Sequence, residues 1–242
     1  MKVQKEWMNI SDMMSGLMMI FLFIAISFMI EVEDDKNRAE KLAQEYKKSQ
    51  DSIKEIVVTY QASQAMLNQD LYAEFKKDLQ RWGAEITKDN SFRFNSPEVL
   101  FRTGSSKISK DFKRILNDFF PRYINLLTSK KYIKEIDEIR VEGHTTNDWK
   151  KRASKNSIYL KNMRLSQNRA NNVLSYCYLI RKNLSQTQKR WLEQKFRANG
   201  MAFSKLIYKK GGEMDSKKSK RVEFRVVTKA QEKIYKIIEQ FR

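Results

Sequence analysis

An acidic residue stands directly before a long apolar stretch near the start of the chain. Asp12 precedes residues 13–30, a run of 18 residues that contains no charged side chain. Transfer of a carboxylate into hydrocarbon is costly, so an acid held within a membrane usually serves a function there. Asp12 is therefore the first candidate for a functional side chain. The alternative is structural, since Asp also caps helix N-termini well.

The apolar stretch is long enough to cross a membrane. At about 1.5 Å per residue, residues 13–30 cover about 27 Å, and the uncharged residues 7–11 extend the run to about 36 Å. Lys2 and Lys5 precede this run, and four acidic residues follow it between positions 31 and 35. The basic flank of a membrane helix tends to stay in the cytoplasm. We expect residues 1–6 to be a cytoplasmic start, residues 7–30 a transmembrane helix, and the rest of the chain to be exported.

A cleaved signal peptide is the competing interpretation of this stretch. It would also combine a basic start with an apolar core, and Ala25, Ile26 and Ser27 resemble a cleavage site with small residues. However, Asp12 would interrupt the start of that core, and apolar residues continue to Ile30. These features favour an uncleaved anchor.

Charge is distributed unevenly along the chain. Residues 91–242 contain 36 basic and 14 acidic side chains, whereas residues 31–90 contain 10 basic and 13 acidic ones. A basic excess of this size favours polyanionic partners such as nucleic acid, acidic lipid or cell-wall polymer. In the predicted topology the basic segment meets the cell wall and not the chromosome, so we expect no direct nucleic-acid partner.

Few residues are available for the chemistry of soluble enzymes. Cys177 and His144 are the sole cysteine and the sole histidine, which excludes an intrachain disulfide and disfavours a zinc site or a hydrolytic centre. Cys177 lies in an apolar helical pattern, where a small buried thiol is expected. No glycine-rich phosphate loop occurs either. We therefore expect no enzyme activity, no bound metal and no cofactor.

Residues 31–90 are predicted to form a helical stalk. No Gly or Pro occurs between residues 31 and 82, and Glu, Lys, Gln and Ala are abundant, as in a strong helix. Apolar residues recur every seven positions from Ala39 to Leu67, which favours a short parallel coiled coil. The apolar seam then drifts to Leu71, Phe75, Leu79 and Trp82. For this second part, a helix packed on its own domain is the alternative.

Residues 91–242 are predicted to form one α/β domain, an α+β sandwich in which helices pack on a mixed sheet. Strand patterns occur at residues 99–101, 138–142, 196–203 and 221–227. Helical patterns occur at residues 109–127, 157–180 and 186–196, with a further helix at the C-terminus. Gly83 and the Asp89-Asn90 pair mark the end of the preceding stalk.

Four segments of this domain together resemble the OmpA-like peptidoglycan-binding domain. Residues 99–105 are similar to its first strand and turn, and residues 141–145, which include Gly143-His144-Thr145, to its second strand and Gly-His-Thr signature. Residues 220–224 are similar to its closing strand. Its helix motif is matched by Asn162, Leu165, Ser166, Arg169, Ala170 and Val173.

The resemblance implies a site that binds a wall peptide. In OmpA-like domains an Asp directly after Gly-His-Thr and the Arg of the helix motif bind diaminopimelate. Arg169 takes the second role, since its planar guanidinium can pair with a carboxylate through two hydrogen bonds. This chain has Thr146 in place of the Asp, so Asp148 could grip the ligand ammonium from a displaced position, or Thr146 and Asn147 could contact it as neutral partners. The implied peptidoglycan-binding set is Thr145, Thr146, Asn147, Asp148, Asn162, Leu165 and Arg169.

The order of the segments also resembles the B subunit of ion-driven stator motors of the MotB type. Those proteins join a short cytoplasmic start, a membrane helix with an Asp near its beginning, a helical connector and an OmpA-like domain. Asp12 takes the place of the ion-carrying aspartate, and Ser11 and Ser15 could line the ion path or pack between helices. The resemblance implies a homodimer of this chain within five copies of a polytopic MotA-like subunit, in the bacterial inner membrane. The transported ion would be H⁺ or Na⁺.

Details of the two ends distinguish among such motors. The cytoplasmic start is short, no Pro occurs before Pro97, and Gly-His-Thr is followed by Thr146, with Trp149 nearby. These features resemble the ZorB subunits of Zorya anti-phage defence systems more than flagellar MotB. The resemblance implies an anti-phage motor driven by the proton-motive force and anchored to peptidoglycan. A flagellar-type stator subunit and a passive wall anchor without ion transport are the alternatives.

Overall fold

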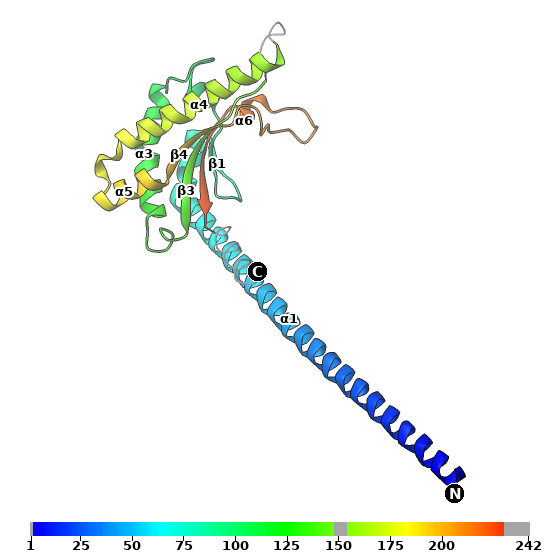
Figure 1. Ribbon diagram of the computed structural model, residues 1–242. Coiled ribbons are helices and arrows are strands. Elements are labelled where there is room, and N and C mark those ends of the chain that lie inside the picture. The colour runs from blue at the N-terminus through cyan, green and yellow to red at the C-terminus, as the bar shows by residue number, and fades with distance from the viewer. Residues whose placement is uncertain (1, 148–153, 230–242) are drawn as a thin grey trace. The chain divides into compact units, whose positions relative to one another are not determined.

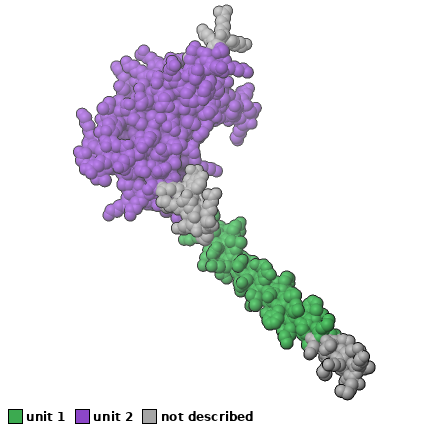
Figure 2. Space-filling model, in the orientation of Figure 1, with its two compact units in different colours: residues 1–55, 234–242 green, residues 56–233 purple. Residues whose placement is uncertain are grey.

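The computed structural model describes residues 2–147 and 154–229, with side chains described from Met13 onward (Figure 1). The helix predicted at the C-terminus falls outside the described residues. The chain divides into two compact units, one around residues 1–55 and the other spanning residues 56–233 (Figure 2).

Helix α1 spans Lys2–Trp82, and residues 31–82 within it contain no Gly or Pro, as expected for a strong helix. It ends where Gly83 adopts a positive φ of 59°, the left-handed conformation that commonly terminates a helix. Within α1 the large apolar side chains between Met13 and Ile30 are all exposed. An 18-residue window of this part has a mean hydropathy of 2.4 and contains no buried residue. By length and composition α1 can cross a membrane, and it is the one helix among the described residues that can.

The last part of α1 belongs to the core of the folded domain. Leu67, Leu71, Phe75 and Trp82 are at most 4 % exposed. The Phe75 ring lies 5.3 Å from that of Phe92, measured between ring centres. The apolar seam beyond Leu67 therefore reflects packing of the helix on its own domain and not a coiled coil.

Five strands form one mixed sheet; a mixed sheet was predicted, but β1 and β2 were not among the four predicted strands. In spatial order they are β1 (Ala84–Ile86), β2 (Phe92–Phe94), β5 (Val222–Thr228), β3 (Ile136–Gly143) and β4 (Phe196–Gly200). The β3–β4 pair is parallel and the other neighbouring pairs are antiparallel.

Helices pack on this sheet and complete an α/β sandwich (Figure 1). The described helices after the first two strands are α2 (Pro97–Leu100), α3 (Lys110–Leu127), α4 (Lys155–Leu179), the 3₁₀ turn η1 (Arg181–Asn183), α5 (Gln186–Lys195) and α6 (Ser216–Ser219). Ser109, Ser154 and Ser185 begin α3, α4 and α5, each accepting a hydrogen bond from a backbone N–H of the first turn, as good N-caps do. The Phe119 ring of α3 lies 4.5 Å from that of Phe92 in β2, so the core sits between the helices and the sheet.

Two local predictions differ from the structure. Residues 99–101 are not a strand, because Pro97 starts the short helix α2 and Phe101 forms only an isolated bridge with Ile108. Proline suits the first helical position, since its missing N–H has no intrahelical partner there. The first two strands of the sheet instead precede α2, and β1 lies within the segment that the sequence assigned to the stalk.

Side-chain amides attach the β1–β2 hairpin to α1. Asn68 Nδ2 donates hydrogen bonds to the Thr87 carbonyl oxygen at 2.7 Å and to Asn90 Oδ1 at 2.9 Å. Asn90 Nδ2 donates to the Gln64 carbonyl oxygen at 3.0 Å. Asn90 has a φ of 60°, a conformation that Asn tolerates better than most residues. We call these contacts the amide clasp.

Candidate functional site

A cavity of about 400 Å³ opens where the segment after β3 meets α4 and α2. This size suits a small ligand such as an amino acid or a short peptide. Five of the predicted peptidoglycan-binding residues meet there. The lining includes Pro97, Glu98 and Phe101 around α2, Thr145 and Thr146 after β3, Asn162, Leu165 and Arg169 of α4, and Lys220.

Arg169 supplies a buried positive charge to this cavity. The residue is 9 % exposed, and its Nε donates a hydrogen bond to the Ser105 carbonyl oxygen at 2.9 Å. Its guanidinium carbon lies 4.8 Å from the centre of the Phe101 ring. Burial lowers the pKa of Arg169 to about 10, so the group remains a cation at neutral pH. Within the described part of the chain no carboxylate pairs with it, and such a buried cation suits an anionic ligand.

Close packing of α4 on the sheet sets the position of Arg169. A Cβ atom at Gly143 would lie 2.3 Å from the Ser166 carbonyl oxygen, so only glycine allows this approach. Ser166 Oγ accepts a hydrogen bond from the Ala202 N–H at 2.9 Å. Arg169 lies about one helical turn beyond Ser166, on the same face of α4.

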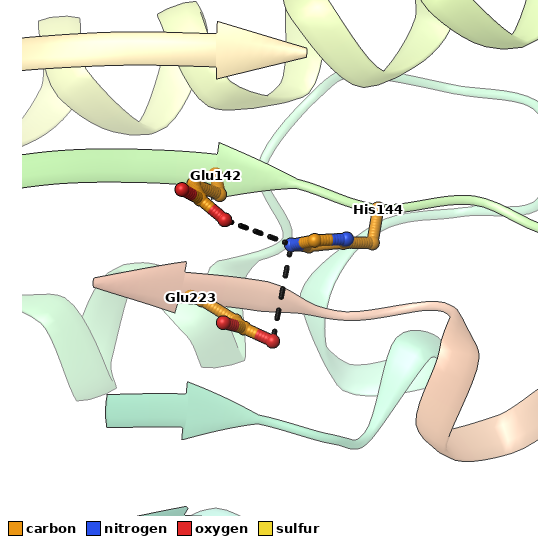
Figure 3. Close-up of side chains that lie close together, drawn as sticks. All are labelled: Glu142, His144 and Glu223. Atoms are coloured by element: carbon orange, nitrogen blue, oxygen red, sulfur yellow. Dashed lines mark ion pairs between the residues drawn. The ribbon is translucent and has the colours of Figure 1, made fainter. Parts of the chain in front are cut away.

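A second group of polar side chains lies beside the Gly-His-Thr turn (Figure 3). His144 Nε2 lies 3.5 Å from Glu142 Oε2 and 3.8 Å from Glu223 Oε1. Glu142 and Glu223 face each other across β3 and β5, and all three residues are at most 2 % exposed. Their ligand-type atoms lie within 4.8 Å of one another. The sequence, with its single histidine, did not indicate this cluster.

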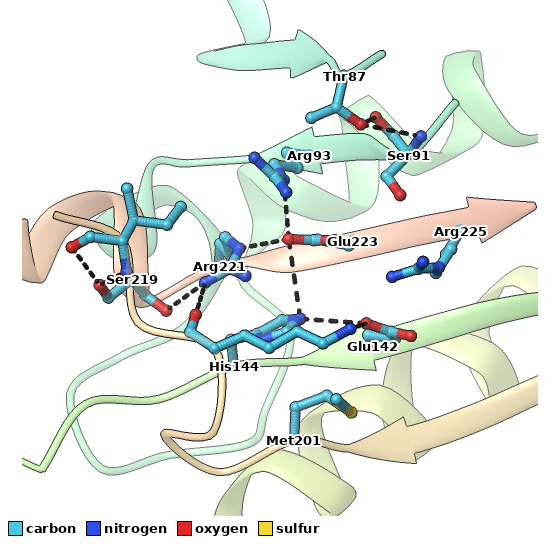
Figure 4. A network of polar contacts seen from close by, with 12 residues as sticks. Thr87, Ser91, Arg93, Glu142, His144, Met201, Ser219, Arg221, Glu223 and Arg225 are labelled. Atoms are coloured by element: carbon cyan, nitrogen blue, oxygen red, sulfur yellow. Dashed lines mark hydrogen bonds and ion pairs between the residues drawn. The ribbon is translucent and has the colours of Figure 1, made fainter. Parts of the chain in front are cut away.

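Positive side chains already balance the two carboxylates (Figure 4). Glu223 Oε1 accepts hydrogen bonds from Arg93 Nε at 2.8 Å and from Arg221 Nε at 2.5 Å. Lys205 Nζ lies 4.0 Å from Glu142 Oε2. A divalent cation would have to compete with two guanidinium groups for Glu223 and would add like charge beside them. We therefore interpret the cluster as an internal salt-bridge network that holds the turn after β3.

Burial and charge in this network also shift the pKa values of His144 and Glu142. Burial lowers the pKa of His144 in spite of the two carboxylates nearby. Burial by itself would raise the pKa of Glu142, but His144 and Lys205 outweigh that effect and the pKa is lowered. At neutral pH a neutral His144 therefore lies beside an ionised Glu142.

The remaining predicted site residues lie apart from the cavity or outside the described side chains. Asn147 is exposed and does not belong to the described lining, and Asp148 lies outside the described residues. Ser11 and Asp12 fall within α1, before the first described side chain, and Ser15 is exposed on α1. The roles of Ser11, Asp12 and Ser15 in ion transport stay predictions.

Two charged lining residues were not assigned from the sequence. Glu98 and Lys220 both line the cavity. Each stands at the edge of a segment that resembles OmpA-like domains, Glu98 directly before residues 99–105 and Lys220 at the start of residues 220–224. Their position beside these segments was the one feature of the sequence that could have assigned them to the site.

Comparison with known proteins gives matches at the level of family, whole chain and structure. Residues 100–219 match the OmpA family. The chain is 42 % identical over 237 residues to the Zorya protein ZorB of Escherichia coli strain Crooks, and the match covers 98 % of this chain and 93 % of that protein. Among solved structures, a MotB-like protein from Desulfovibrio vulgaris has 18 % identity and a TM-score of 0.46, covering 72 % of this chain and 94 % of its own. The cell wall anchor of the T6SS from Pseudomonas aeruginosa has 18 % identity and a TM-score of 0.42, covering 65 % and 96 %.

Proposed function

This chain belongs to the family of the Zorya protein ZorB and carries an OmpA-family domain, and from this premise we propose that it is the B subunit of an ion-driven motor in the inner membrane. In this proposal the N-terminus lies in the cytoplasm and α1 crosses the membrane once. The OmpA-like domain lies in the periplasm and binds peptidoglycan. The motor serves anti-phage defence.

The observation that supports the membrane anchor in this proposal is the exposed apolar stretch of α1. Its large side chains between Met13 and Ile30 are exposed in the isolated chain, and exposed apolar side chains on every face of a helix require an apolar solvent. A passive wall domain needs an anchor but does not need an acid at the start of that anchor. Asp12 is what distinguishes a motor subunit from a passive anchor.

Asp12 would act through the energetic difference between its two protonation states. A carboxylate in a desolvated site is unfavourable, and binding of H⁺ or Na⁺ neutralises it. Each neutralisation changes the electrostatic preference of this residue for a polytopic partner of the MotA type. Repeated ion binding and release at Asp12 could thereby drive stepwise movement of five partner subunits around a dimer of this chain. Ser11 and Ser15 are candidate members of the ion path.

The middle of α1 supports the proposed homodimer. Leu42, Tyr46 and Tyr60 are 68 %, 66 % and 40 % exposed, and Tyr46 and Tyr60 belong to the seven-residue repeat. Exposed apolar residues at this spacing suit a second parallel helix of the same sequence. The two copies would each contribute one Asp12.

The cavity around Arg169 is the proposed wall-binding site. Its buried guanidinium offers paired donors for a ligand carboxylate, and wall peptides carry free carboxylates. Thr145, Thr146, Asn162 and Leu165 complete the described part of this site.

Phage plating efficiency on cells that carry the native operon tests the motor. The variants are Asp12→Asn and, as a matched control, Asp34→Asn, which removes the same charge after the apolar stretch. Membrane levels of each protein are checked by blotting. We expect the wild type and Asp34→Asn to protect, and Asp12→Asn to allow plating equal to that on cells without the operon.

Other outcomes point to the alternatives. Protection that survives Asp12→Asn would reduce Asp12 to a helix cap and leave a passive wall anchor. Absence of protection by the wild type would favour a flagellar-type subunit, which swimming motility would then test.

A further inference from the structure

The cavity around Arg169 also has a negatively charged group at its edge. The side chain of Glu98 on α2 is 62 % exposed, whereas Arg169 is 9 % exposed. Among the described lining residues Glu98 carries the only carboxylate. The cavity therefore combines a buried cation with an anion that faces solvent.

Lys217 indicates that an alkylammonium group fits against Glu98. Its Nζ lies 3.5 Å from Glu98 Oε1, and its side chain is 67 % exposed. Such an exposed pair contributes little to stability, because water screens the charges and two long side chains lose freedom. Glu98 can therefore exchange the Lys217 ammonium for the ammonium of a ligand at little cost.

The other polar groups of the cavity do not provide this function. Thr145, Thr146 and Asn162 are neutral, and Arg169 and Lys220 are cationic. A lining with two cations repels an ammonium group unless a carboxylate offsets them. Hydrogen bonds between ionised partners are also about twice as strong as those between neutral ones.

We propose that Glu98 binds the ammonium group of the wall ligand while Arg169 binds its carboxylate. The ligand class is a zwitterionic amino-acid unit of a wall peptide, with a free carboxylate and a free amine. This assignment rests on the proposed attachment to peptidoglycan. It gives the role of the ammonium-binding acid to a residue of α2, on the side of the cavity formed by α2 and the turn after it.

Co-sedimentation of the full-length protein in detergent with purified peptidoglycan sacculi tests the assignment. The sacculi are used before and after acetylation of their free amines, which removes the ammonium charge and leaves the carboxylates. We expect the wild type to bind acetylated sacculi about three- to tenfold more weakly than native sacculi. Glu98→Gln should bind native sacculi with that reduced affinity and should no longer distinguish the two preparations.

Glu213 provides the matched control. Its carboxylate lies 3.6 Å from Lys209 Nζ with a 79 % exposed side chain, so it forms the same kind of exposed pair away from the cavity. Glu213→Gln should behave as the wild type. A Glu98→Gln protein that still prefers native sacculi would overturn the assignment.

Two further variants separate this inference from the proposed function. Arg169→Gln should lose binding to both preparations, whereas Arg164→Gln, at an exposed position of the same helix, should keep it. Normal binding by Arg169→Gln, or no binding by the wild type, would overturn the wall-binding site and the inference with it. If Asp148→Asn abolishes the preference for native sacculi and Glu98→Gln does not, Asp148 is the ammonium ligand and only the assignment of Glu98 is overturned.

Discussion

Helix α1 contains two apolar stretches that meet different surroundings. Between Met13 and Ile30 the large apolar side chains are 45–79 % exposed. Between Leu67 and Trp82, four apolar side chains are at most 4 % exposed. Both stretches are α-helical, so helix propensity does not distinguish them.

The arrangement of apolar residues around the helix explains the difference. In residues 13–30 they occupy every face, so no single protein surface could cover them. In residues 67–82 they recur every three or four positions and form one face. The first pattern suits a lipid environment and the second suits a protein core. One continuous helix therefore contains segments suited to two different environments.

Loss of an aromatic side chain should affect the two stretches unequally. Phe75→Ala should lower the free energy of unfolding of the folded domain by about 3–5 kcal/mol, since Phe75 is fully buried against Phe92 and Phe119. Phe23→Ala should leave it unchanged, because Phe23 is 66 % exposed. Urea unfolding of the full-length protein in detergent, followed by tryptophan fluorescence, measures both. Equal losses would contradict the distinction between the stretches.

A charge in the first stretch should disturb the membrane and not the core. Leu22→Lys should cost about 3–4 kcal/mol of insertion free energy and raise the fraction of protein that alkaline carbonate extracts from membranes. Leu42→Lys makes the same change at a residue that is 68 % exposed outside the stretch, and should not alter extraction. Unchanged extraction of Leu22→Lys would argue against residues 7–30 as the span.

Acid should destabilise the folded domain, which holds the second stretch. Burial lowers the pKa of His144 in the folded state, so the unfolded chain binds the proton first. Stability is complete above the unfolded pKa of about 6.5 and is lost as the pH falls through the folded value, by at most about 1.4 kcal/mol per pH unit. The lowered pKa of Glu142 adds a loss below its unfolded value of about 4.3.

Unfolding free energies between pH 8 and pH 5 measure the contribution of His144. His144→Gln should flatten the decline below pH 6.5 relative to the wild type. A wild-type domain that gains stability on acidification would show that the predicted direction of the pH dependence is wrong.

Removal of Arg122 should slightly weaken the attachment of the second stretch of α1 to α3. Arg122 on α3 lies 2.7 Å from Glu74, 2.9 Å from Asp78 and 3.1 Å from Asp118. Because its side chain is 31 % exposed, Arg122→Leu should cost about 1 kcal/mol of unfolding free energy. Arg114→Leu, at a side chain that is 79 % exposed, should cost close to nothing. Equal values for the two variants would exclude a special role for Arg122 in holding α1 to α3.

Elements with long regular patterns could be predicted from the sequence. The strand predicted at residues 138–142 lies within β3, and the helices predicted at residues 157–180 and 186–196 correspond to α4 and α5. Alternation over five residues or a helical period over ten or more carries enough signal to identify such elements.

The β1–β2 hairpin had no such signal. Each strand has three residues, which is too short for an alternating pattern, and the hairpin is attached to α1 by side chains distant in sequence.

At residues 99–101 the error is the opposite one, because a strand was predicted where none forms. Their apolar side chains suit a strand, but Pro97 initiates a helical turn just before them.

The cavity was only partly predictable for a related reason. Thr145 and Arg169 belong to motifs that are recognisable in the sequence, and the structure places them in one lining. Glu98 joins them only because α2 contributes to the same cavity, which is a tertiary contact that no local pattern encodes. The sequence shows that Glu98 is charged, but it does not show which residues surround Glu98 in the folded domain.

The amide clasp has a mechanical consequence. Asn68 and Asn90 link the β1–β2 hairpin to α1 through hydrogen bonds of 2.7–3.0 Å. Because these bonds join the same two elements, a force that separates the hairpin from α1 loads more than one of them. Tension or torque that reaches the last turns of α1 therefore passes into the sheet without a hinge. In a motor held on the cell wall, the folded domain would act as a stiff fixed end against which the membrane partners turn.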